Sequence, residues 1–218
     1  KNHKGALRST ITVQIMISSK LFITGCDSST RWMLPWFEAN FKKHNPKAQL
    51  HVFNFDNEFT ENERWFKKPA AMMAASYMAE YVCWIDTDID VRCNIEDIFD
   101  YVEPNKLAMV EDQPWTTRRG EVWHNSGVVA FKNKPSILAE WSKSVGKVDQ
   151  SANPMVGDQD VLHVLVKDDL KRRIYITDIP KQYNTLRLDV IDGTCPKNIK
   201  MMHWTGQKGN DEIRSLMK

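Results

Sequence analysis

The sequence lacks the features that mark secreted, membrane-spanning or nucleic-acid-binding proteins. Its four cysteines show no C-x-x-C spacing and Cys83 lies inside an apolar run, so we expect free thiols in a reducing, cytoplasmic compartment. No apolar stretch reaches the length of a transmembrane helix and no signal peptide is recognisable, so we expect no transmembrane segment. The net charge is only +2, from 30 Lys and Arg against 28 Asp and Glu, which gives no reason to expect a nucleic-acid partner.

Length and composition predict one compact domain, with a tight pair of half-domains as the alternative. The 218 residues suffice for a substantial core, and the hydrophobic share of 42% and charged share of 27% are ordinary for a globular protein. Residues 1–19 are set apart as an N-terminal arm or extra strand, because residues 1–10 are polar and basic and Ile11–Ile17 alternate apolar with polar residues. Residues 20–218 form the main domain. The chain begins with Lys1 rather than Met, which is compatible with further domains of a longer protein.

An apolar run that ends in three alternating carboxylates is the most informative stretch. Residues 81–91 read as a buried strand, and in open α/β sheets the ligand site lies beyond the carboxyl ends of such strands. Side chains two residues apart share one side of a strand, so we expect Asp86, Asp88 and Asp90 to project together, about 6–7 Å apart. Their repulsion, roughly 2–3 kcal/mol per pair, would become attraction around a divalent cation.

These carboxylates have two alternative interpretations. An isolated Asp-x-Asp at a strand end is often only a solvated turn. The D-x-D-x-D pattern also opens calcium-binding EF-hand loops, but such a loop needs a glycine where Val91 stands and a helix before it. We therefore prefer a site for Mg²⁺ or Mn²⁺, with the solvated turn as the alternative.

The order of the expected elements favours an α/β fold with a doubly wound sheet. Leu21–Thr24 reads as a core strand, and the turn Gly25–Ser29 after it is typical of the entry to a nucleotide site. An N-cap at Ser28 or Ser29 is the alternative for that turn. Further expectations, in chain order, are a helix from Thr60 to Lys68, a helix over Ala70–Glu80, a polar loop over Glu111–His124, a helix starting at Asp158 and a strand over Arg173–Thr177.

Five short segments follow one another in the order of the motifs of one enzyme family. They are Trp84–Asp88, Asn125–Val129, Gly157–Leu162, Ile179–Asn184 and His203–Lys208. They resemble the DxD strand, the Asn-small-Gly-Val strand, the Asp-Gln-Asp helix start, the Leu-Pro-x-x-Tyr-Asn segment and the C-terminal His loop of GT-A nucleotide-sugar glycosyltransferases. The retaining group that includes glycogenin and the lipopolysaccharide galactosyltransferases is the most similar.

Three departures from the pattern of that group are visible. Lys208 comes one residue early, and Gly209-Asn210 replace the Pro-Trp that commonly follows. Lys68 stands where an arginine is usual upstream of the DxD strand. These differences bear on the sugar and the acceptor more than on the fold.

The resemblance implies a Rossmann-like GT-A catalytic domain over residues 20–218, with a mostly parallel sheet flanked by helices. It implies a metal-dependent hexosyltransferase that uses a nucleoside-diphosphate sugar, above all a UDP-sugar. The acceptor would be a hydroxyl of a glycan, glycoprotein or lipid, and the outcome retaining.

The resemblance also implies the residues of the site. Mn²⁺ or Mg²⁺ would be held by Asp86, Asp88 and His203. Asp158, Gln159 and Lys208 would be catalytic, the first two at the donor sugar and the lysine at the leaving phosphate. The donor-binding residues would be Thr24, Gly25, Cys26, Asp27, Lys68, Asp86, Thr87, Asp88, Asn125, Gly206 and Lys208.

Several of these residues also have simpler interpretations. Lys208 could be a solvated C-terminal lysine, Asp158 an N-cap, Lys68 a surface lysine beside Lys67, and His203 a structural histidine. Because an amide is a poor nucleophile, we prefer front-face displacement to a covalent intermediate on Gln159.

Three alternative functions share parts of this pattern. An inverting reaction would need a carboxylate base, for which Asp158 or Asp160 is the candidate. A sugar-phosphate nucleotidyltransferase normally needs a Gly-rich loop bearing Arg or Lys after the first strand, which residues 25–28 lack. A non-catalytic sugar-binding module is the third alternative.

Overall fold

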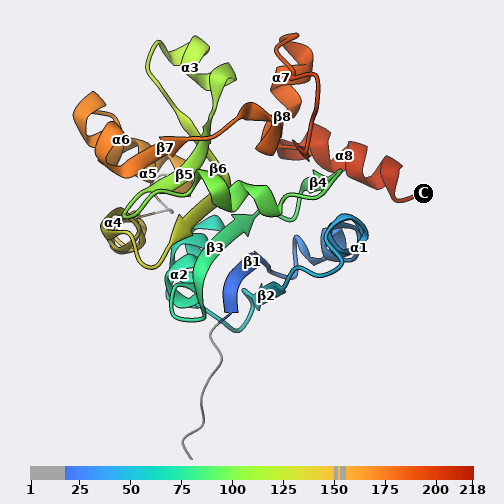
Figure 1. The fold of residues 1–218 in the computed structure, drawn as a ribbon, viewed down its shortest axis with the longest axis horizontal. Helices are drawn as coiled ribbons and strands as arrows, with labels where there is room; N and C mark the ends of the chain where they lie inside the picture. Colours follow the sequence, from blue (N-terminus) through green and yellow to red (C-terminus); the bar gives the residue numbers. More distant parts are fainter. Residues whose placement is uncertain (1–17, 150–151, 153–155) are drawn as a thin grey trace, which may run out of the picture.

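A six-stranded mixed sheet runs through the middle of the protein, in a computed structural model that describes residues 18–149, 152 and 156–218 (Figure 1). All neighbouring strands are parallel except at β6, which is antiparallel to both β3 and β5. The prediction of a mostly parallel α/β sheet is confirmed. Residues 1–17 of the predicted arm, with its strand Ile11–Ile17, lie outside the described residues, and Ser18 and Ser19 open β1. In spatial order the strands are β2 (Leu50–Asn54), β1 (Ser18–Cys26), β3 (Ala79–Ile85), β6 (His124–Lys132), β5 (Leu107–Glu111) and β7 (Ile176–Asp178).

Helices cover both faces of the sheet, and β3 supplies side chains to the two cores in turn. Val82 and Trp84 pack with α2 (Lys67–Ala75), α4 (Ser136–Val145) and α5 (Asp158–Val166). Cys83 and Ile85 pack on the other face with α1 (Leu34–His44) and the 3₁₀ helix η3 (Glu96–Tyr101). This alternation explains why the strand reads as an unbroken apolar run, since both of its faces are buried.

A second, three-stranded sheet joins the C-terminal part of the chain to the end of β3. Its order is β4 (Ile89–Val91), β9 (Met201–His203) and β8 (Thr185–Leu186), with β4 and β9 antiparallel. Helix α8 (Gly206–Leu216) follows β9, and α7 (Arg187–Ile191) follows β8. Figure 1 shows α3 (Gln113–Arg119) and α7 standing side by side beyond one end of the central sheet, where Arg118 and Asp192 form an ion pair.

The remaining elements are short. They are the 3₁₀ helices η1 (Arg31–Met33), η2 (Arg64–Phe66) and η4 (Lys181–Tyr183), and helix α6 (Asp169–Tyr175). Within the described part of the chain, none of the helices combines the length and apolar character needed to cross a membrane.

Two predicted elements between β2 and β3 are wrong in extent. The segment from Thr60 is a turn followed by η2, with Arg64 in the left-handed region at φ 47°, so no regular helix runs to Lys68. Helix α2 ends at Ala75 rather than Glu80, because Ala79 already pairs with Ser18 of β1. Tertiary pairing overrides the helix propensity of the Ala- and Met-rich stretch here.

Two further predictions are wrong in type. The expected polar loop after β5 contains α3, whose N-cap Asp112 accepts a hydrogen bond from the Trp115 backbone N–H (3.1 Å) and whose end is the left-handed Gly120 (φ 71°). The expected strand over Arg173–Thr177 is mostly helix α6, and β7 begins only at Ile176. The predicted helix starting at Asp158 is confirmed as α5.

Candidate active site

The carboxylates that end β3 lie in a turn. Strand β3 stops at Ile85, the chain turns through Asp86 and Asp88, and Ile89 opens β4 in the small sheet. The prediction that Asp86, Asp88 and Asp90 share one side of a single strand is therefore wrong. The turn still brings the first two together, whereas the Asp90 carboxylate accepts a hydrogen bond from a side chain of α1 instead.

His203 joins these two carboxylates from the far end of the sequence. Strands β4 and β9 pair so that Ile89 stands opposite His203, which carries the imidazole to the turn. Its Nε2 lies 3.2 Å from Asp88 Oδ1 and 3.9 Å from Asp86 Oδ2. One ligand atom from each of the three residues lies within 4.8 Å of the other two. Two carboxylates and an imidazole form a donor set that suits Mn²⁺, so these residues fit a divalent cation.

Gly127 makes the room that the imidazole occupies. A Cβ at this position would lie 2.3 Å from His203 Cε1, closer than real contacts allow, so only glycine lets the ring lie against β6. Burial alone would lower the pKa of His203, but Asp88 and Asp86 outweigh it and raise the pKa above its usual value. Without a cation, these carboxylates therefore favour the charged imidazole.

Lys68 lies buried between two carboxylates rather than on the surface. From α2 its Nζ reaches to 3.0 Å from Asp86 Oδ1 and 3.4 Å from Asp158 Oδ2, and it donates to the Ser126 carbonyl (3.1 Å). Burial lowers the pKa of Lys68, but Asp158 and Asp86 outweigh it and raise the pKa, so the amine is charged. Burial raises the pKa of Asp86, and Lys68 opposes that shift. The alternative of a surface pair with Lys67 is wrong.

Asn125 and Gln159 are held by a network of hydrogen bonds. Because β6 runs antiparallel to β3, its first residues lie beside the end of β3. Asn125 Nδ2 donates to Gln159 Oε1 (3.1 Å) and to Asp112 Oδ2 (3.2 Å), and Gln159 Nε2 donates to the same Asp112 oxygen (3.2 Å). Burial raises the pKa of Asp112, and the hydrogen bonds that it accepts oppose the shift. Gln159 is thus fixed on both sides of its amide.

Asp158 is the first residue of α5 and not its N-cap. Gly157 occupies the N-cap position, and its N–H donates to Asp160 Oδ2 (2.8 Å). The N-cap alternative for Asp158 is therefore wrong. Its carboxylate faces Lys68, while that of Asp160 is engaged by the helix start.

A cavity of about 580 Å³ leads from the Asp86–Asp88 turn to the end of β1. Three of its thirteen lining residues are aromatic, and two of these rings, Phe55 and Trp84, stack with centroids 6.1 Å apart and planes 4° from parallel. Gly25 lies against the Phe55 ring, where a Cβ would be 2.5 Å from a ring carbon. The lining residues are Gly25, Asp27, Ser29, Thr30, Met33, Phe55, Arg64, Trp65, Lys68, Trp84, Asp86, Thr87 and Asp88.

Asp27 closes the turn at one end of this cavity. Its Oδ1 accepts hydrogen bonds from the Ser29 N–H (2.9 Å) and hydroxyl (2.6 Å) and from Thr30. Burial raises the pKa of Asp27, but these hydrogen bonds outweigh it and lower the pKa overall. The turn is therefore fixed by an ionised carboxylate, as in other Asx turns.

Seven of the predicted residues neither line the cavity nor belong to the metal-ligand cluster. Asn125, Asp158 and Gln159 lie in the network of contacts described above, and the other four are Thr24, Cys26, Gly206 and Lys208. Thr24 and Cys26 are buried in β1 and do not line the cavity. Burial raises the pKa of the Cys26 thiol. Gly206 and Lys208 lie exposed at the start of α8, and among the described residues no hydrogen bond or ion pair of Lys208 is found.

Besides four residues of the cavity lining (Ser29, Thr30, Met33 and Phe55), five residues of the site are absent from the set predicted from sequence. The sequence could have indicated Trp84, because a tryptophan in a buried strand needs a hydrogen-bond partner for its N–H. In the structure its Nε1 donates to Asp86 Oδ1 (2.6 Å). The sequence could also have indicated Asp112, because an Asp shortly before a proline such as Pro114 is typical of a helix N-cap. Arg64 and Trp65 line the cavity without any local signal. Asn184 belongs to one of the five motif segments, but no local pattern indicates its partner.

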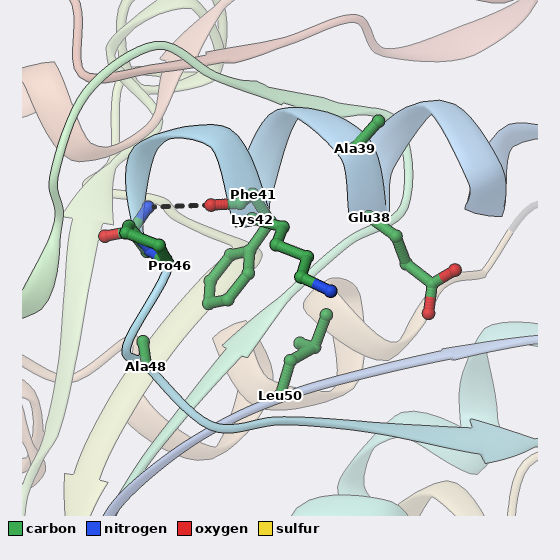
Figure 2. Close-up of a pocket in the computed structure, with 8 residues that line it drawn as sticks. Glu38, Ala39, Phe41, Lys42, Pro46, Ala48 and Leu50 are labelled. Atoms are coloured by element: carbon green, nitrogen blue, oxygen red, sulfur yellow. Dashed lines mark hydrogen bonds between the residues drawn. The ribbon is translucent and has the colours of Figure 1, made fainter.

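A second cavity lies between α1 and the start of β2, at the opposite end of the strand from the site. It has about 410 Å³, and Figure 2 shows the Lys42 side chain extending along the helix toward Glu38, with Leu50 beneath. The helix ends above it, where the Asn45 N–H donates to the Phe41 carbonyl (2.8 Å). Its lining holds one acidic, one basic and one amide side chain among apolar ones, so it contains no group of several titratable side chains of the kind found at the candidate active site.

Solved structures of glycosyltransferases share this fold. The galactosyltransferase LgtC, solved in complex with donor and acceptor sugar analogs, matches with a TM-score of 0.59 at 15% identity, over 90% of this chain and 94% of that chain. A glycosyltransferase involved in the glycosylation of the major capsid of PBCV-1 matches with a TM-score of 0.63 at 14% identity, over 90% and 99%. GlyE from Streptococcus pneumoniae matches with a TM-score of 0.59 at 15% identity, over 87% of this chain and 56% of that chain. No protein-family model matches, and no curated protein is significantly similar in sequence. These likenesses show that the chain has the fold of these glycosyltransferases.

Proposed function

We propose that the protein is a metal-dependent glycosyltransferase that moves a hexose from a UDP-sugar to a hydroxyl of a glycan, glycoprotein or lipid. The observation that carries the proposal is the cluster of Asp86, Asp88 and His203 at one end of the cavity. The fold shared with known glycosyltransferases supports it. A cavity of about 580 Å³ lies within the range of small-molecule sites, and the aromatic residues among its lining suit a nucleobase.

The three ligands would hold Mn²⁺ or Mg²⁺ against the diphosphate. Such an ion, when bound, supplies Lewis-acid stabilisation of the negative charge that grows on the departing diphosphate. The chain's own contribution is to fix the ligands: Trp84 and Lys68 hold Asp86, and Gly127 seats His203. Trp65 and the turn of Asp27 would bind the base and ribose, and Thr87 would contact the diphosphate.

We assign the donor sugar to the side of Asn125, Asp158 and Gln159, with retention of configuration. The Gln159 Oε1 already accepts from Asn125 Nδ2 and from the Ser126 N–H (3.2 Å), so both of its donors would have to be lost before it attacked carbon. Front-face displacement avoids this, because the departing phosphate oxygen takes the proton of the acceptor hydroxyl. Lys208 is assigned to the phosphate, which requires α8 to approach the cavity when donor is bound.

The contacts of the Asp158 and Asp160 carboxylates disfavour the inverting alternative. Asp158 faces Lys68 and Asp160 accepts from the Gly157 N–H, so neither is free to act as a general base in this arrangement. A sugar-binding module without catalysis is the other alternative. We also infer a reducing, cytoplasmic compartment, because Cys26, Cys83, Cys93 and Cys195 are all free thiols.

Calorimetry of UDP binding with and without Mn²⁺ tests the proposal. We expect binding by the wild type only with the metal, loss of binding in Asp88→Ala, and full binding in the matched control Asp90→Ala, whose carboxylate lies outside the cluster. Slow hydrolysis across a panel of UDP-hexoses would then identify the sugar. Metal-independent UDP binding that persists in Asp88→Ala, or no nucleotide binding at all, would contradict the proposal, and the second result would favour the sugar-binding module.

A further inference from the structure

A chain of hydrogen bonds joins the metal-ligand cluster to the Gln159 amide. His203 Nδ1 lies 3.0 Å from Asn184 Oδ1, and Asn184 Nδ2 donates to Asn125 Oδ1 (2.8 Å). Asn125 Nδ2 then donates to Gln159 Oε1 and Asp112 Oδ2, where the chain ends. His203, Asn184, Asn125 and Asp112 are 4%, 0%, 8% and 1% exposed, so water has little access to replace these partners.

Backbone groups fix the direction of every bond in this chain. The Gly127 N–H donates to Asn125 Oδ1 (2.9 Å), and the Ser126 N–H donates to Gln159 Oε1. A backbone N–H cannot become an acceptor, so both of these amide oxygens have only one orientation. Asn184 must then present its Nδ2 to Asn125, which leaves its oxygen facing the imidazole.

We propose that Asn184 is a positioning residue that fixes the tautomer of His203, with the proton on Nδ1. The proton of Nδ1 is the only group of the neutral ring that can satisfy Asn184 Oδ1, so the Nε2 lone pair is left facing Asp86 and Asp88. This inference rests on the proposed function in so far as that lone pair serves a metal ion. It adds that Asn125 and Gln159, on the sugar side, belong to the same hydrogen-bonded unit as the metal ligand.

The opposite tautomer of His203 would also find a hydrogen-bond partner. The chain of hydrogen bonds is therefore needed to select between the two tautomers. A proton on Nε2 would point at Asp88 Oδ1, 3.2 Å away, and would block the lone pair that a metal ion needs. It would also leave Nδ1 and Asn184 Oδ1 facing each other as two acceptors. Turning the Asn184 amide would only move that conflict to Asn125, whose oxygen is held by the Gly127 N–H.

The tautomer can be read directly by nitrogen-15 NMR of metal-free protein labelled at histidine. The spectrum is recorded at about pH 9.5, well above the ordinary imidazole pKa of about 6.5, because the carboxylates raise the pKa of His203. The His203 signals are assigned with His203→Gln. We expect Nδ1 protonated in the wild type, Nε2 protonated in Asn184→Leu, and Nδ1 protonated again in Asn184→Asp, which keeps an acceptor for the ring.

Mn²⁺ titrations by electron paramagnetic resonance give the second readout. We expect Asn184→Leu to lose roughly 10- to 100-fold in Mn²⁺ affinity, the usual cost of losing a partner of a metal-binding histidine. Asn184→Asp should lose less, because it keeps the acceptor for Nδ1 and gives up only the donor to Asn125. The matched control is Asn45→Leu, which removes another buried asparagine, 1% exposed, that bonds the Ile95 N–H and the Cys93 carbonyl away from the site. It should destabilise the fold without changing the tautomer or the affinity.

The outcomes separate this inference from the proposed function. Wild type with Nε2 protonated, or Asn184→Leu with Nδ1 still protonated, would overturn the role of Asn184 even if UDP binding depends on Mn²⁺. Absence of Mn²⁺-dependent UDP binding would overturn the proposed function while the tautomer result stands. If Asn184→Leu fails to fold, Nε2 protonation in the wild type or in Asn184→Asp would still overturn the inference.

Discussion

The two halves of the candidate site, the polar network and the cavity, differ in the chemistry of their side chains. On the side of β6, β9 and α5, buried amides and carboxylates hold one another, as at Asn125, Asn184 and Asp112. On the side of β1 and β2, aromatic rings such as Phe55 and Trp65 line the cavity together with polar side chains such as Asp27. Hydrogen-bond networks specify one geometry and are costly to break, whereas aromatic walls tolerate small changes in shape. Substitutions should therefore cost more on the polar side, and should separate metal binding from nucleotide binding.

Lys68→Met should break the polar side most severely. The substitution leaves Asp86 and Asp158 buried without their cation, and removing one partner of a buried ion pair costs about 3 kcal/mol or more in the free energy of unfolding. Urea denaturation measures the loss. Added Mn²⁺ should restore part of it, because the unpaired carboxylates gain a cation.

Lys67→Met is the matched control for that change. Within the described residues the neighbouring amine donates only to the Phe55 carbonyl, so its loss should cost little and Mn²⁺ should not alter it. Equal losses in the two variants, or a loss in Lys68→Met that Mn²⁺ leaves unchanged, would show that Lys68 does not balance the site's carboxylates.

Trp84→Phe tests the residue that belongs to both halves. The ring can still stack on Phe55, but the hydrogen bond from Nε1 to Asp86 Oδ1 (2.6 Å) is lost. Hydrogen bonds to charged groups contribute about 2 kcal/mol, so we expect roughly 30-fold weaker Mn²⁺ binding. Trp141→Phe is the control, since it removes another buried indole bond, to the Asp158 carbonyl. Similar Mn²⁺ affinities in the two variants would contradict a role of Trp84 in holding Asp86.

The Mn²⁺ affinity should rise with pH by about tenfold per unit below the pKa of His203. A metal ion needs the neutral imidazole, and because the carboxylates raise the pKa of His203, the rise should continue above pH 6.5. The stability of the metal-free protein should change in the opposite sense. A raised pKa stabilises the folded state below the unfolded value, and this contribution is lost as the pH rises through the folded one. A flat Mn²⁺ profile between about pH 6 and 8 would contradict this assignment.

The sequence predicts the sheet and the turn at Gly25 better than it predicts the contacts of the polar network or the aromatic residues of the cavity. The alternation of β3 between two cores is a local property, and so is the glycine turn at Gly25. The position of His203 depends on the pairing of β4 with β9, which no local pattern encodes. Only the resemblance of its loop to a known motif points to this histidine.

Helices α2 and α3 also show that local sequence patterns are not sufficient to predict the secondary structure here. Helix propensity predicts an α2 that is longer than observed. The helix ends at Ala75 because Ala79 already pairs with β1 as part of β3. Helix α3 is missing from the predicted elements although its caps, Asp112 and Gly120, are in the sequence. The Asp112 carboxylate also anchors Asn125 and Gln159, a role that depends on three segments meeting and that no local pattern can indicate.

Trp65→Ala should have the smallest effect and should touch nucleotide binding alone. Its ring is 39% exposed at the cavity, and loss of an aromatic contact with a base costs about 1 kcal/mol or somewhat more. We expect UDP affinity, measured by calorimetry with saturating Mn²⁺, to fall by roughly five- to tenfold while Mn²⁺ affinity stays unchanged. Trp115→Ala is the matched control, because that ring has the same 39% exposure but lies on α3 outside the cavity. If Trp65→Ala weakens Mn²⁺ binding as much as UDP binding, the two halves act as one unit, and the division drawn from their chemistry is wrong.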